Sequence, residues 1–229
     1  MIVRLMRERF IVVEQHKHGL IAGELARHMS FTPVPLNSVL YAIAQHDRGW
    51  QKLDEEMKWD EKKQMPYSFA TYPQTPKIAA YTNGIAEVES VDAYAACLCS
   101  LFYATFFKEK SDQEAIQFRD REQERQLHLM THMPKKDRDQ LKTNLELLQF
   151  CDDLSLSLCF NPFGEAEHPW FKNGIMFQGE TYNWKWIDAN HLVLTPSCFG
   201  SLFSVCIPYR IVNQKRQIVE TGMKRLYIE

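Results

Sequence analysis

Two histidines and two aspartates have the types and the sequence context of a metal-binding set. His46 and Asp47 are consecutive in YAIAQHDRGW, while His18 lies in HGLIAGELA and Asp152 in LLQFCDDLSLSLC. Two imidazoles and two carboxylates suit Mn²⁺, Fe²⁺, Co²⁺ or Zn²⁺ better than Ca²⁺, which prefers oxygen ligands alone. These residues therefore predict a site for one divalent metal ion.

Helical periodicity places two of these side chains on apolar faces. In a helix predicted over residues 15–29, His18 shares its stripe with apolar residues. In a second helix predicted over 137–160, Asp152 lies on the apolar stripe, whereas Asp153 is expected to point to solvent. A carboxylate aimed into a core needs a partner, and a metal ion would supply one.

The His46-Asp47 pair should lie at the end of a helix, because apolar residues at helical spacing run from Leu36 to about His46 and Gly49 follows. Asp47 is then the best candidate to orient a water molecule.

Four of the residues that follow the His46-Asp47 pair are further candidates for the site. Arg48 is a candidate for catalysis, and Arg48 and Lys52 are candidates for binding a substrate phosphate. Trp50 could stack on a planar substrate ring or serve as a packing anchor. Asp54 is either a support for the metal ligands, an acid–base group or an ordinary surface carboxylate.

The same residues also permit an account without a metal ion. His18 would then be a hydrogen-bonded core histidine, and His46 would cap a helix terminus. Asp47 and Asp152 would make buried hydrogen bonds or an ion pair with Arg48.

Composition and patterning predict one domain built on helices. A chain of 229 residues with 45% hydrophobic content fills one core. We expect a mainly α fold: a helical bundle over about residues 14–160, with a small antiparallel sheet formed by C-terminal strands (about 175–229) joined by N-terminal strands (1–13). Prolines at 66, 73 and 76 predict an irregular segment with short helical pieces over 51–87, which could form a lid or wall over a site.

Charge and cysteine content exclude several classes of function. The net charge is −2 and the pI is about 6.5, so no basic field would attract nucleic acid or an anionic membrane. Charges of both signs alternate over 111–138, which argues against a nucleic-acid surface there. No segment reaches membrane-spanning length, and the six cysteines lack CxxC spacing, so we expect reduced thiols in a cytoplasmic protein.

The order of these motifs resembles the HD superfamily, which has a His on one helix, a consecutive His-Asp on the next and an Asp on a later helix. The combination of HxxxAGELA, AxxxHDxGW and DxLSLxLC is closer still to the bacterial DUF3891 family, a branch of that superfamily. The resemblance implies an HD-type helical bundle and metal-dependent hydrolysis of a small-molecule phosphoester. It assigns the metal to His18, His46, Asp47 and Asp152.

Two departures from the family pattern weaken this interpretation. Phe102 stands where relatives often carry the histidine of a Ser-x-His motif, so a second metal ion is not expected. Trp50 stands where many HD phosphohydrolases have a lysine, which removes an expected phosphate-binding cation. The alternative is a non-catalytic HD-fold module that binds a nucleotide, a metabolite or a protein partner.

Overall fold

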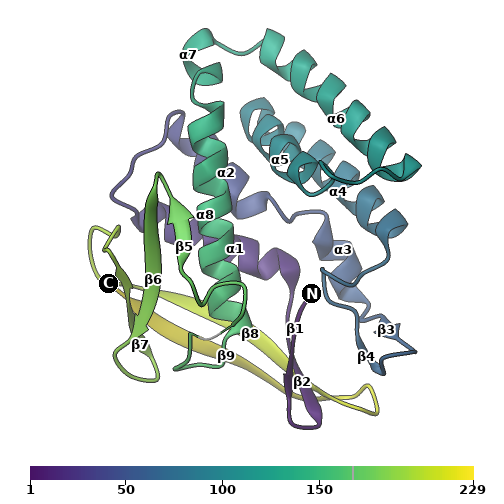
Figure 1. The fold of residues 1–229 in the computed structure, drawn as a ribbon, viewed down its shortest axis with the longest axis vertical. Helices are drawn as coiled ribbons and strands as arrows, with labels where there is room; N and C mark the ends of the chain where they lie inside the picture. The colour runs from purple at the N-terminus through teal and green to yellow at the C-terminus, as the bar shows by residue number, and fades with distance from the viewer. Residues whose placement is uncertain (167) are drawn as a thin grey trace.

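The computed structural model describes residues 1–166 and 168–229, in which a layer of helices lies on a curled β-sheet (Figure 1). The helices are α1 (Gln15–His28), α2 (Leu36–Gln45), α3 (Trp50–Glu55), α4 (Gln74–Glu89), α5 (Ala93–Thr105), α6 (Gln113–Thr131), α7 (Lys135–Arg138) and α8 (Leu141–Phe160). The strands are β1 (Ile2–Met6), β2 (Arg9–Val13), β3 (Trp59–Asp60), β4 (Met65–Pro66), β5 (Ile175–Phe177), β6 (Glu180–Trp186), β7 (His191–Thr195), β8 (Phe203–Asn213) and β9 (Ile218–Ile228).

Seven strands form one sheet in the order β1-β2-β8-β9-β7-β6-β5. Neighbouring strands are antiparallel except β7 and β9, which run parallel. The two edge strands, β1 and β5, both contact α8, and α1 contacts β8. The sheet therefore curls as a half-barrel, with α8 along its concave side (Figure 1).

The prediction of a mainly α fold with a small sheet is wrong, because strands make up 23% of the chain beside 45% helix and the half-barrel is a main layer. Pro208 and Gly222 break the apolar pattern of β8 and β9, so the sequence suggests only short strands there. In the structure both residues lie within one long ladder, where Pro208 is opposite Met223 and Gly222 is opposite Tyr209. A Cβ at Gly222 would lie 2.5 Å from the outer end of the Tyr209 ring, so a larger residue here would force this half-buried side chain to move.

The segment predicted over 51–87 is irregular, with one short helix, only as far as residue 73. The prediction is wrong beyond it, because α4 is a regular helix of 16 residues. Pro76 is the third residue of α4, within the first turn, where backbone N–H groups have no partner inside the helix. A proline there removes no helical hydrogen bond.

Three helices bring the candidate ligands together. His18 is on α1, His46 follows the last residue of α2, and Asp152 is on α8. These helices begin and end within a few residues of their predicted bounds, and α1 contacts both α2 and α8. Of the helices in the described ranges, none has the length and apolar character needed to cross a bilayer.

Candidate metal centre

Close packing of α1 on α2 sets the two histidines side by side. A Cβ at Gly23 would lie 2.6 Å from the Ala44 Cβ, so glycine is what lets the two helices approach this closely. The His18 and His46 rings consequently meet edge to face, with their centroids 5.2 Å apart. Both side chains are almost fully buried, at 0% and 2% exposure.

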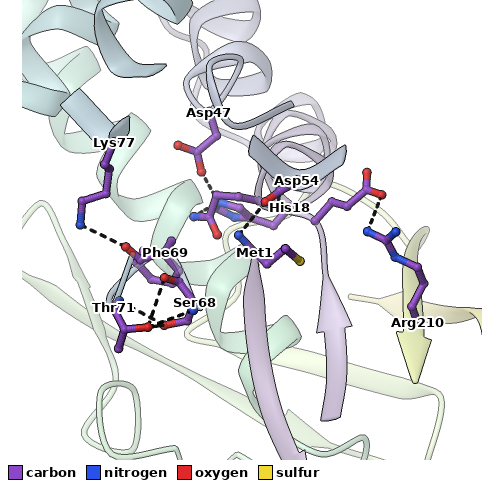
Figure 2. Close-up of polar contacts among 11 residues, drawn as sticks. Met1, His18, Asp47, Asp54, Ser68, Phe69, Thr71, Lys77 and Arg210 are labelled. Atoms are coloured by element: carbon purple, nitrogen blue, oxygen red, sulfur yellow. Dashed lines mark hydrogen bonds and ion pairs between the residues drawn. The ribbon is translucent and has the colours of Figure 1, made fainter. Parts of the chain in front are cut away.

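Asp47 joins the two histidines in a compact triad. One ligand atom from each of His18, His46 and Asp47 lies within 4.8 Å of the other two. The Asp47 Oδ2 atom is 2.7 Å from His18 Nε2 and 3.5 Å from His46 Nε2. Figure 2 shows the carboxylate of Asp47 and the His18 ring pointing toward each other.

Asp152 approaches the triad from α8. Its Oδ1 atom is 3.3 Å from His46 Nε2 and 3.6 Å from His18 Nε2. Metal–ligand bonds of about 2.0–2.2 Å at tetrahedral angles separate neighbouring ligand atoms by roughly 3.3–3.6 Å. Three of the four contacts match this spacing, and the His18–Asp47 contact would lengthen by several tenths of an ångström to accept an ion.

The orientation of both rings is fixed through their Nδ1 atoms. His46 Nδ1 is 2.7 Å from the Ile43 carbonyl oxygen, which can only accept, so Nδ1 carries the proton. This carbonyl lies in the last turn of α2, where no later helical N–H reaches it. His18 Nδ1 is 2.8 Å from Ser155 Oγ, whose own hydrogen is donated to the Asp152 backbone oxygen. His18 Nδ1 is therefore also the donor.

Both Nε2 atoms are consequently left with lone pairs that face carboxylates. His46 Nε2 is buried and has no hydrogen-bond partner among the described residues. His18 Nε2 lies 3.1 Å from the Gln15 side-chain nitrogen, which can donate to it, but it also meets Asp47 at 2.7 Å. Lone pairs facing lone pairs in a buried site require a positive charge between them, which either protons or a metal ion can supply.

The pKa values reflect the same requirement. Burial alone would lower the pKa of His46, but Asp47 and Asp152 raise it well above its ordinary value. Burial would raise the pKa of Asp47, but His46 and His18 hold it well below its usual range. Tyr103 donates its hydroxyl hydrogen to Asp47 Oδ1 at 2.6 Å and so fixes this carboxylate from the other side.

A cavity of about 490 Å³ reaches the cluster at Asp152. Phe102 also lines it and meets the His46 ring edge to face at a centroid distance of 5.2 Å. Asp153 does not point to bulk solvent as its helical position predicts, because it lines the same cavity. Its burial, with the charge of Asp152 added, raises the pKa of Asp153 to about 7.

The residues that follow the His-Asp pair lie away from the cluster. Arg48 donates through Nε to Glu87 at 2.9 Å, and the exposed Lys52 ammonium is 3.9 Å from the same glutamate. Trp50 is 1% exposed and packs edge to face on Tyr72, with ring centroids 5.5 Å apart. None of these three side chains lines the cavity.

The Asp54 side chain contacts the N-terminal residue of the chain rather than the metal ligands. Its Oδ1 atom is 2.8 Å from the Met1 amino nitrogen (Figure 2). Its Oδ2 atom accepts the backbone N–H of Gln15. Asp54 therefore ties β1 to the first turn of α1. Its support of the triad is at most indirect, through the placement of α1.

Three residues near the cluster are missed by reasoning from the sequence. Ser155 lies three residues after Asp152 and so shares its helical face, which is a usable signal. Tyr103 gives no signal, because most residues of α5 are buried and apolar. His16 falls on the side of its helix opposite His18, which predicts a solvent-exposed side chain. It is instead 7% exposed, and burial lowers its pKa to about 4 despite the opposing charge of Asp47.

Comparison with known proteins gives one family. The model of the family described as "Protein of unknown function (DUF3891)" matches residues 1–214. No curated protein and no solved structure matches the chain. The matched range includes all four candidate ligands and every strand except β9.

Proposed function

This chain belongs to the DUF3891 family, and from the geometry of its His-Asp cluster we propose that it is a divalent-metal-dependent hydrolase of phosphoesters. His18, His46 and Asp47 would hold the ion, and Asp152 would complete the set from the cavity side. The order of these residues also resembles the HD superfamily, and this resemblance is the basis for proposing a phosphoester as the substrate.

One observation carries the proposal: two buried imidazoles, each donating through Nδ1, direct their Nε2 atoms at carboxylates. Hydrogen bonding at the opposite nitrogen is the usual arrangement around a metal-binding histidine. Without a metal ion, only protons could supply the positive charge that these facing lone pairs require.

A bound divalent ion would acidify a water molecule and polarise a phosphoryl oxygen. The chain's own contribution is positioning. Tyr103 holds one oxygen of Asp47, which leaves the other for the ion or for orienting the attacking water. The cavity beside Asp152 gives a substrate access to this side of the cluster.

Metal analysis of untagged protein by inductively coupled plasma mass spectrometry tests the proposal. We expect about one equivalent of Mn²⁺, Fe²⁺, Co²⁺ or Zn²⁺ in the wild type and at least a tenfold loss in His46→Ala and Asp152→Asn. Asp153→Asn is the matched control, because it changes the neighbouring carboxylate and should keep the ion. Hydrolysis of p-nitrophenyl phosphate and bis-p-nitrophenyl phosphate should fall about 100-fold or more in the same two variants.

If the wild-type protein stays metal-free after reconstitution with each ion, the proposed hydrolase function is contradicted. The cluster would then be an imidazolium–carboxylate network, and a non-catalytic binding module would be the better account. If the metal-loaded wild type hydrolyses neither probe nor a wider set of phosphoesters, the metal site is supported and the phosphoester substrate class is rejected.

A further inference from the structure

The cavity beside the cluster has two aromatic walls. On the α5 side Phe102 and Phe106 meet edge to face, with ring centroids 4.8 Å apart. On the opposite side Phe150 of α8 stacks on Phe177 of β5, also at 4.8 Å. Its volume of about 490 Å³ lies in the range of small-molecule sites.

The charge of this cavity is entirely negative. Glu146, Asp152 and Asp153 line it, and the lining residues include no lysine or arginine. In the part of the chain that the structure describes, Glu146 and Asp153 take part in no ion pair. The arginine and lysine that follow the His-Asp pair, Arg48 and Lys52, lie against Glu87 away from the cavity.

A second feature shows that the carboxylates are more than a solvated acidic surface. Asp152 is only 8% exposed and belongs to both the cavity and the cluster. It faces His46, whose Nε2 atom is fully buried and has no hydrogen-bond partner among the described residues. The cavity thus ends at buried polar groups whose bonding is incomplete.

Carboxylates between aromatic faces favour a cation and disfavour an anion. A cation within about 6 Å of an aromatic ring is attracted by its face, most strongly where water is excluded. A free phosphate would instead meet three carboxylates and no basic side chain. The only positive charge open to a phosphoryl group would be the ion itself.

We propose that the cavity binds the organic part of the substrate and that this part carries an ammonium group. The ammonium would lie between the two phenylalanine pairs, near Glu146 and Asp153, and the ester would point toward Asp152. This inference rests on the proposed function for the reaction, but the binding of the cation can be measured without turnover.

Isothermal titration calorimetry with choline as the probe tests the inference. Its uncharged isostere 3,3-dimethylbutan-1-ol has the same shape without the charge, and inorganic phosphate probes the opposite sign. We expect choline to bind the metal-free protein at least tenfold more tightly than the isostere, with no measurable phosphate binding. Glu146→Gln should reduce this preference several-fold, whereas Glu124→Gln on α6, an exposed glutamate outside the cavity, should leave it unchanged.

The two proposals fail separately. Suppose that the metal-free form binds choline and its isostere equally, or binds phosphate more tightly, while the same protein takes up one metal ion on reconstitution. This result would overturn the ammonium inference alone. Selective choline binding by a protein that never holds a metal ion would keep the cation site and reject the hydrolase. Thermal unfolding of each variant shows whether a loss of choline binding results only from a loss of folded protein.

Discussion

The segment that follows α2 contains two adjacent regions that both look suited to chemistry in the sequence but differ in the structure. In the first, His46 and Asp47 face a buried cluster in which bonding capacity is unmet. In the second, Arg48 is paired with Glu87, and Trp50 is packed against aromatic rings. Both regions contain residue types suited to catalysis.

The difference teaches that bonding state separates a candidate site from a structural element better than residue type does. A side chain whose charge and hydrogen bonds are satisfied by the protein has no unmet bonding left for a ligand. His46 Nε2, buried and without a hydrogen-bond partner among the described residues, is the opposite case. We call Arg48, Trp50 and Lys52 the satisfied region. The comparison fails if a substitution in this region changes metal binding or substrate affinity.

Truncation of Trp50 should have the largest effect in the satisfied region. Because this side chain is 1% exposed, Trp50→Ala should lower the free energy of unfolding by about 3–5 kcal/mol. Trp50→Phe, which keeps an aromatic ring beside Tyr72, should lose much less. Urea unfolding measures the stability, and metal analysis of folded protein should show unchanged stoichiometry.

A rise in KM for Trp50→Phe without a loss of stability would contradict this division. It would show that Trp50 meets the substrate, as the ring-stacking hypothesis requires.

Removal of the hydroxyl that orients His18 should have the next largest effect. Ser155→Ala takes away the acceptor of the Nδ1 hydrogen and should weaken metal binding about 10–100-fold. Ser157→Ala is the matched control, because this serine is equally buried on α8 but bonds to Trp184 instead. Competition with a chromophoric chelator measures both affinities, and equal values would show that Ser155 does not act on the metal site.

The helices that position the cluster can be predicted because each carries a periodic apolar stripe. Helical spacing alone is enough to place His18 and Asp152 on the inner faces of α1 and α8. The half-barrel cannot be predicted in the same way. Residues 218–222 of β9 are mostly exposed, so the strand has little apolar pattern, and the curl depends on long-range contacts of β1 and β5 with α8.

The site is less predictable than its four central residues suggest. Periodicity tells which face of a helix a residue occupies, but not what that face meets. Asp153 lies off the apolar stripe and is therefore expected in solvent, yet β5 and α5 enclose that side and turn it into a cavity wall. The position of Arg48 after the pair suggests catalysis, although Glu87, distant in sequence, binds it.

Replacement of Arg48 should have the smallest effect and is the sharpest test of the comparison. The Arg48–Glu87 pair is on the surface, with both side chains about two-fifths exposed, so Arg48→Gln should cost less than about 1 kcal/mol of stability. Metal stoichiometry and kcat/KM should stay at the wild-type values, because the guanidinium does not line the cavity. Lys52→Gln, which removes the other cation near Glu87, should behave in the same way. A tenfold fall in kcat/KM for Arg48→Gln alone, with its metal retained, would place Arg48 at the substrate and join the two regions into one site.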